Sequence, residues 1–359
     1  MSKKYIYGAG VFGVALAKHF KEIGINTAFI DAYKTTSPLE GISLFKPGDI
    51  PIYPNDTLYI AALMVPIHKN VDEDLQVSLS KYSWSIVDTY KTFKLYPKAL
   101  EYFMSDGYMW RQRGIKPLVN SERINELRAL LSDSRSLELL EKIERFRADA
   151  LPENYPIPDI GCDYFPNDFD PYEVFGSLSI ADCGSFDGNS CRDFLQFQGH
   201  KIKNYYAFEP DPDVFQSLTK KMQVTKQEYP SVNFVCMPTG VGSEVKILTF
   251  QSGLAGCSHL DEKGDIQVPI VNLDSILSGT DINFIKIDVE GAEIEVLEGA
   301  KQLIINKTPG IAVSLYHVPE HLWQVPLLIN KYNKNYNMYL RQHNHWGMEL
   351  TLYCVPIEI

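Results

Sequence analysis

The chain has 359 residues, a net charge of −11 and a pI near 5.3, which argue against nucleic acid or an anionic membrane as a partner. This length predicts at least two domains, each with a core of its own. The six cysteines form no Cys-x-x-Cys pair, which is typical of reduced thiols in a cytoplasmic protein and gives no sign of a metal site. No apolar run approaches the roughly 20 residues that a membrane span needs.

The first 31 residues have the pattern of a strand, a glycine turn, a helix and a second strand. Residues 4–7 are predicted to form the first strand, and the glycines follow in the spacing Gly8-x-Gly10-x-x-Gly13. The second strand, residues 27–30, ends in Asp31. Lys3 and Lys4 before an apolar stretch resemble a signal peptide, but the strand-turn-helix interpretation explains more of the sequence.

Three further strands are predicted at residues 42–45, 58–62 and 84–87, after which the alternation stops. We therefore predict a small Rossmann-like α/β domain over residues 1–90, half the size of a complete dinucleotide site. The glycine spacing and Asp31 match the dinucleotide fingerprint. Three interpretations stay open for this domain: a remnant used for docking, a nucleotide or nucleotide-sugar site in which Asp31 accepts ribose hydroxyls, or an NAD site.

Residues 91–170 are predicted to form a helical connector. Between residues 118 and 150, apolar positions recur at helical spacing, which predicts one or two amphipathic helices. Their expected role is packing between the domains, with a homodimer contact as the alternative. Four prolines between residues 152 and 166 then mark an irregular entry to the next domain.

A second glycine loop follows the apolar strand predicted at residues 178–181. It begins at Asp182 and contains Gly184 and Gly188. This spacing is not a dinucleotide fingerprint, and a carboxylate before the first glycine would repel a pyrophosphate. The carboxylate would instead suit the ammonium group of a methionine moiety, directly or through water. The next strand ends at Glu209, where a carboxylate typically accepts both ribose hydroxyls.

A third carboxylate follows the strand predicted at residues 284–287, in which Phe284, Ile285 and Ile287 are apolar. Asp288 and Glu290 lie where this strand gives way to a helix after Gly291. Ligands of open α/β sheets bind outside the carboxyl ends of the strands, so these side chains are expected to face a pocket. A purely structural alternative is that Glu290 and Glu293 favour the positive end of the following helix. Asp182, Glu209 and Asp288 thus lie at the ends of three predicted strands. Their order along the chain is the one expected of a nucleoside-binding pocket.

The rest of the chain completes an α/β pattern. A third strand is predicted at residues 232–237, followed by an inserted hairpin of residues 245–250 and 266–271. The fifth strand, residues 310–315, leads to His317. Residues 338–341 and 350–355 are expected to form a terminal antiparallel pair.

The loop of residues 182–190, the corner at 208–210 and the segment 286–293 resemble FkbM-type methyltransferases. The resemblance covers about residues 120–359 and implies a Rossmann-like class I methyltransferase domain, placed at residues 171–359, with S-adenosylmethionine as cofactor. Ser185 stands where the family commonly has alanine. The expected cofactor-binding residues are Asp182, Gly184, Ser185, Gly188, Asn189, Ser190, Glu209 and Asp288.

For methyl transfer, an enzyme must align the acceptor, the methyl carbon and the sulfur, and must exclude water. A hydroxyl acceptor also needs a base. His317 is the first candidate for this base because histidine has a pKa near neutral. Asp288 and Glu290 are the next candidates. They could instead hold a divalent cation, but no ligand spacing demands one, so no metal is predicted.

The resemblance implies O-methylation of a carbohydrate or another small hydroxylated molecule, although the sequence leaves a nitrogen acceptor open. Two other classes remain open. The chain could be a scaffold that binds S-adenosylmethionine without turnover, or an NAD-dependent oxidoreductase that uses the residues from Gly8 to Asp31. The oxidoreductase interpretation gives no function to the segment around Asp288.

Overall fold

The computed structural model describes residues 3–49, 55–61, 85–105, 119–149, 151–159, 161–251, 259–260, 266–344 and 349–357. Contacts divide the chain into two units, Met1–Val119 with Glu141–Ile157, and Asn120–Leu140 with Pro158–Ile359. This division differs from the predicted boundaries at residues 90 and 170. The helices of the predicted connector are shared between the two units.

The first unit contains a parallel sheet with the strand order β3-β2-β1-β4-β5. The strands are β1 (Lys4–Tyr7), β2 (Thr27–Ile30), β3 (Leu44–Phe45), β4 (Thr57–Ile60) and β5 (Ser85–Val87). Its helices are α1 (Val11–Glu22), α3 (Thr89–Leu95), α4 (Pro97–Ser105) and the 3₁₀ helix η2 (Pro152–Asn154). All five strands are at predicted positions, although Ala62 and Trp84 lie outside the described residues. Phe12 of α1 packs against Phe103 of α4.

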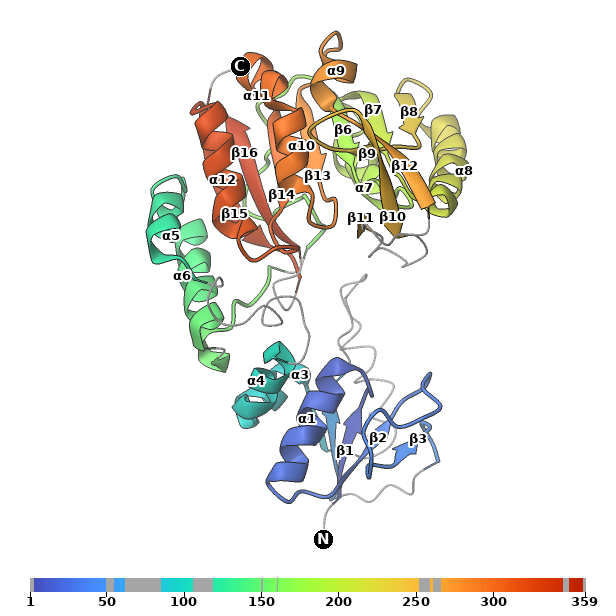
Figure 1. The fold of residues 1–359 in the computed structure, drawn as a ribbon, viewed down its shortest axis with the longest axis vertical. Coiled ribbons are helices and arrows are strands. Elements are labelled where there is room, and N and C mark those ends of the chain that lie inside the picture. Colours follow the sequence, from blue (N-terminus) through green and yellow to red (C-terminus); the bar gives the residue numbers. More distant parts are fainter. Residues whose placement is uncertain are drawn as a thin grey trace. The chain divides into compact units, whose positions relative to one another are not determined.

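The second unit is built on a sheet with the order β15-β16-β14-β13-β6-β7-β8 (Figure 1). These strands are β6 (Leu178–Cys183), β7 (Ile202–Phe208), β8 (Asn233–Met237), β13 (Phe284–Ile287), β14 (Gly310–Ser314), β15 (Tyr336–Gln342) and β16 (Leu350–Pro356). The helices that follow them are α7 (Asn189–Gln198), α8 (Pro212–Glu228), α9 (Leu273–Leu277), α10 (Glu293–Gly299), α11 (Lys301–Lys307) and α12 (His321–Tyr332). Along the described parts of the chain, none of the helices combines the length and apolar character needed to cross a membrane.

The register of this sheet places the predicted strand ends side by side. β13 pairs in parallel with β6, and β6 pairs in parallel with β7. Every residue of β6 and β13 is buried, which explains why both strands have near-continuous apolar sequences. β16 runs antiparallel to β14 and β15, which confirms the predicted terminal pair.

A smaller sheet is inserted after β8. Its strands are β9 (Gly240–Val241), β10 (Lys246–Gln251), β11 (His259–Leu260) and β12 (Ile266–Val271), in the order β11-β10-β12-β9. β10 and β12 are antiparallel, as predicted for the inserted hairpin.

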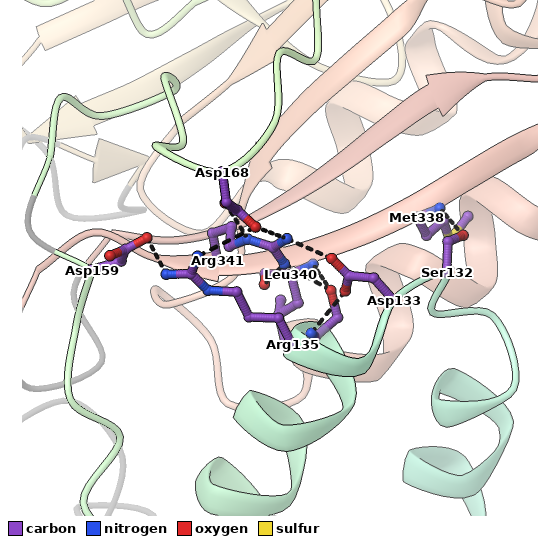
Figure 2. A network of polar contacts seen from close by, with 9 residues as sticks. Ser132, Asp133, Arg135, Asp159, Asp168, Met338, Leu340 and Arg341 are labelled. Carbon is purple, nitrogen blue, oxygen red and sulfur yellow. Dashed lines mark hydrogen bonds and ion pairs between the residues drawn. The ribbon is translucent and has the colours of Figure 1, made fainter.

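The helices α5 (Ser121–Arg128) and α6 (Ser134–Asp149) confirm the amphipathic pattern between residues 118 and 150. An ion-pair network ties the start of α6 to β15, as Figure 2 shows. The guanidinium of Arg341, whose side chain is 2% exposed, lies between Asp133 and Asp168. Its Nη1 also donates to Ser136 Oγ at 2.9 Å. These contacts explain why residues 120–140 group with the second unit.

Candidate active site

Three carboxylates lie at the carboxyl ends of the adjacent strands β13, β6 and β7. Asp182 is the penultimate residue of β6, before the glycine loop, while Asp288 and Glu209 directly follow β13 and β7. The Asp288 N–H donates to the Cys183 carbonyl at 3.0 Å, and the Glu209 N–H donates to the Met237 carbonyl at 3.2 Å. The structure therefore brings together the three strand ends that the sequence singled out.

The glycine loop approaches the end of β13 too closely for a side chain. Gly184 has a φ of +80°, and a Cβ built on it would lie 1.8 Å from the Asp288 carbonyl oxygen. Ser185 is buried, and its hydroxyl donates to the Asp182 carbonyl at 2.9 Å and accepts from the Phe208 N–H at 3.1 Å. Gly188, with a φ of +88°, then caps α7. The loop thus presents its backbone at the strand ends.

Asp182 supports this loop from the core. Its side chain is fully buried, and its Oδ1 atom lies 3.0 Å from Lys286 Nζ. Its Oδ2 atom accepts hydrogen bonds from Ser190 at 2.8 Å and Tyr205 at 2.6 Å. The carboxylate is thus enclosed by its own cation and hydroxyls, and its expected role toward a ligand ammonium group, directly or through water, stays a prediction. Asn189, the remaining predicted loop residue, is exposed at the start of α7.

Glu209 holds the backbone that follows β6 and β7 by hydrogen bonds. Its Oε2 atom accepts from the Phe186 N–H and its Oε1 atom from the Asp211 N–H, each at 2.9 Å. Burial raises the pKa of this carboxyl to about 7, although the two backbone hydrogen bonds act in the opposite direction. Each oxygen retains a lone pair for a further donor. A ligand hydroxyl donating there would favour the charged carboxylate.

His317 meets the carboxylates of the segment after β13. Its Nε2 atom lies 3.5 Å from Asp288 Oδ1 and 3.4 Å from Glu290 Oε2. Asp288 Oδ2 also accepts a hydrogen bond from the Tyr164 hydroxyl at 2.7 Å. Tyr316 donates to Asp288 Oδ1 at 3.3 Å. All three predicted catalytic residues therefore lie in one cluster.

Excess negative charge perturbs the carboxyls around this cluster. Burial and the nearby charge of Asp288 raise the pKa of Asp163 to about 6. Burial, with the charges of Asp163 and Asp288, raises the pKa of Glu349 well above its usual range. Perturbed acids in such a place are typical of sites that bind a cation or move a proton. Among the described residues, no three His, Cys, Asp or Glu side chains are arranged to hold a metal ion.

Left-handed backbone conformations at non-glycine residues accompany this cluster. Positive φ angles occur at Tyr164 (67°), Phe186 (47°), Glu290 (55°) and Glu349 (53°), each of which contributes a contact or a carboxylate described here. Such conformations cost about 1–3 kcal/mol each and gather at ligand clamps and active sites.

Three residues with polar roles in the site were not predicted: Tyr164, Lys286 and Glu293. Lys286 has a sequence signal, since a lysine inside an otherwise apolar buried strand requires an anionic partner. Glu293 was interpreted only as a helix N-terminal acid, but its carboxylate contacts His317. Tyr164 lies 124 positions from Asp288, and no local pattern indicates that pairing.

The N-terminal glycine loop has its own local order. Gly8 has a φ of +103°, and a Cβ on Gly13 would lie 2.0 Å from the Gly8 carbonyl oxygen. Asp31 accepts the N–H groups of Ala9, Tyr33 and Lys34 at 2.8, 2.8 and 2.9 Å. Asp31 therefore links the turn after β1 to the turn after β2. The nucleotide site at Gly8, Gly10, Gly13 and Asp31 stays a prediction.

Comparisons with known proteins agree with the second unit's geometry. Residues 182–347 match the model of the methyltransferase FkbM domain. The hexuronic acid methyltransferase AglP of Haloferax volcanii is 28% identical over 102 residues, which are 27% of this chain and 41% of that protein. The crystal structure of methyltransferase FkbM from Methylobacillus flagellatus superposes with a TM-score of 0.65 at 18% identity, covering 98% of this chain and 90% of that one.

The solved structure establishes similarity of fold, and the matched segment contains the glycine loop, Glu209, Asp288 and His317. These findings confirm the resemblance seen in the sequence. Residues 182–347 of this chain are therefore similar to the methyltransferase FkbM domain.

Proposed function

We propose that the chain is an S-adenosylmethionine-dependent methyltransferase that transfers the methyl group in line to a hydroxyl of a sugar or glycan-linked acceptor. The observation that carries this proposal is the juxtaposition of the glycine loop and Glu209 with the cluster of Asp288, Glu290 and His317. We call the glycine loop and Glu209 the cofactor cradle. The cradle and the group of proton acceptors lie at the same edge of the sheet.

The cofactor cradle fits an adenosyl group in two respects. Glu209 offers one free lone pair on each carboxylate oxygen, as a ribose diol requires. Because Gly184 has no Cβ, the loop can lie directly against the end of β13, which places its backbone at the strand ends. When bound, S-adenosylmethionine supplies an activated methyl group on a sulfonium. Asp182, Ser185 and Ser190 would act indirectly, by holding the loop.

The cluster around His317 supplies the other half of the reaction. As the acceptor oxygen forms its bond to the methyl carbon and the carbon–sulfur bond breaks, the hydroxyl proton must pass to a base. His317 and Asp288 are the candidates because both lie beside the cradle. Tyr164 and Tyr316 hold the Asp288 carboxylate by hydrogen bonds at 2.7 and 3.3 Å.

The acceptor class is inferred from the hexuronic acid named for the Haloferax relative and from the aromatic rings near Asp288. An assay of S-adenosylhomocysteine release with hexuronic acid glycosides, neutral glycosides and nucleotide sugars tests it. We expect turnover with at least one sugar hydroxyl. Asp288→Asn should reduce kcat by about 100-fold or more, while cofactor binding partly survives.

Glu295 is an exposed residue of α10, and Glu295→Gln is the matched control. This variant should retain wild-type turnover. If the protein binds S-adenosylhomocysteine but releases none with any hydroxyl acceptor, the scaffold interpretation replaces the enzyme.

A further inference from the structure

Glu293 is the first residue of α10, and its side chain is fully buried. Its Oε1 atom accepts the N–H groups of Val289 and Gly291, each at 3.2 Å. A buried carboxylate is costly unless several partners compensate its lost hydration. The two backbone donors bracket Glu290, whose φ is 55°. Glu293 thus fastens the turn that carries the candidate carboxylates.

The same carboxylate meets two histidines from the other side of the site. His317 Nδ1 lies 2.8 Å from Oε1, and His321 Nδ1 lies 2.8 Å from Oε2. His317 follows β14, whereas His321 begins α12. With Nδ1 held by Glu293, the Nε2 atom of His317 is directed at Asp288 and Glu290. One buried acid therefore fixes the imidazole and the turn that it faces.

We propose that Glu293 is a positioning residue for methyl transfer: it orients His317 and sets the pH range in which His317 can accept a proton. This inference rests on the proposed function for its catalytic consequence. The geometry resembles the general arrangement in which a carboxylate orients a histidine that acts on a substrate.

The charges around His317 give the direction of the pH effect. Burial disfavours the imidazolium, but the hydrogen bond with Glu293 and the charges of Glu293, Asp288 and Glu290 outweigh it and raise the pKa of His317 to about 9. The Tyr316 ring lies tilted against the imidazole, with centroids 4.1 Å apart and ring planes at 44°. Because the neutral imidazole is the form that accepts a proton, kcat/KM should rise with pH up to about pH 9.

The decisive experiment measures the pH profile of kcat/KM and the NMR titration of the His317 imidazole in three variants of the full chain. In Glu293→Gln, loss of the charge should move both midpoints down by about one to two pH units, and kcat should fall about tenfold or more. Glu293→Asp keeps the charge but shortens the side chain, so kcat should fall with little change in the midpoint. Glu295→Gln should match the wild type.

Affinity for S-adenosylhomocysteine should stay within about twofold in all three variants, because Glu293 positions the proton acceptor and not the cofactor cradle. An unchanged His317 midpoint in Glu293→Gln overturns the inference. If that variant does not fold, unchanged kcat in Glu293→Asp overturns it equally. The NMR titration does not depend on turnover, so it decides the role of Glu293 even if no acceptor is methylated.

Discussion

Replacing Gly184 with alanine is expected to lower the free energy of unfolding by about 3 kcal/mol and to abolish binding of S-adenosylhomocysteine. The added Cβ would lie 1.8 Å from the Asp288 carbonyl oxygen, and the φ of +80° is unfavourable for any side chain. The loop and the end of β13 must therefore separate, which displaces the backbone that we assign to the cofactor. Urea denaturation and calorimetric titration measure the two effects.

Gly176→Ala is the matched control, because a Cβ at Gly176 would meet no heavy atom within 4 Å. Its stability should stay within about 0.5 kcal/mol of the wild type, and its ligand affinity should be unchanged. Wild-type stability and affinity in Gly184→Ala would show that the close approach of loop and strand has no role in the site.

Lys286→Met is expected to destabilise the protein by about 3–5 kcal/mol. The Lys286 side chain is 3% exposed, and its Nζ atom pairs with Asp182 and donates to the Gly184 carbonyl at 2.6 Å. Methionine keeps most of the volume but leaves the buried Asp182 carboxylate without its cation. Lys203→Met, at an exposed position of β7, should change stability by less than about 0.5 kcal/mol.

The double variant Lys286→Met/Asp182→Asn separates loss of the pair from loss of packing. Asparagine can still accept hydrogen bonds from Ser190 and Tyr205 and carries no charge. We expect it to recover at least about 1 kcal/mol relative to Lys286→Met alone. Additive losses in denaturation experiments would mean that the two charges are not coupled.

The strands of the second unit could be predicted because their burial on both faces requires apolar runs. β6 and β13 are fully buried, and the acids that interrupt or follow them stand out in the sequence. Parallel pairing then makes the strand ends neighbours, so the positions of Glu209 and Asp288 followed from local patterns.

What the acids contact could not be predicted in the same way. Asp182 lies in the core because Lys286 arrives from β13, and their pairing depends on the register of two strands about 100 residues apart. The role of Glu293 likewise depends on how α10 packs against α12, which brings His321 to its carboxylate. Such contacts are set by tertiary packing, and a helix-terminal acid looks the same with or without them.

Calorimetric titration with S-adenosylhomocysteine tests the proposed cofactor site most directly, with NAD titrated in parallel. We expect micromolar binding to the wild type, weakened about tenfold or more in Glu209→Ala because a buried ligand diol loses its acceptor. Glu228→Ala, an exposed acid at the end of α8, should bind like the wild type. Absence of S-adenosylhomocysteine binding together with clear binding of NAD would contradict the proposal and assign the cofactor to the N-terminal glycine loop.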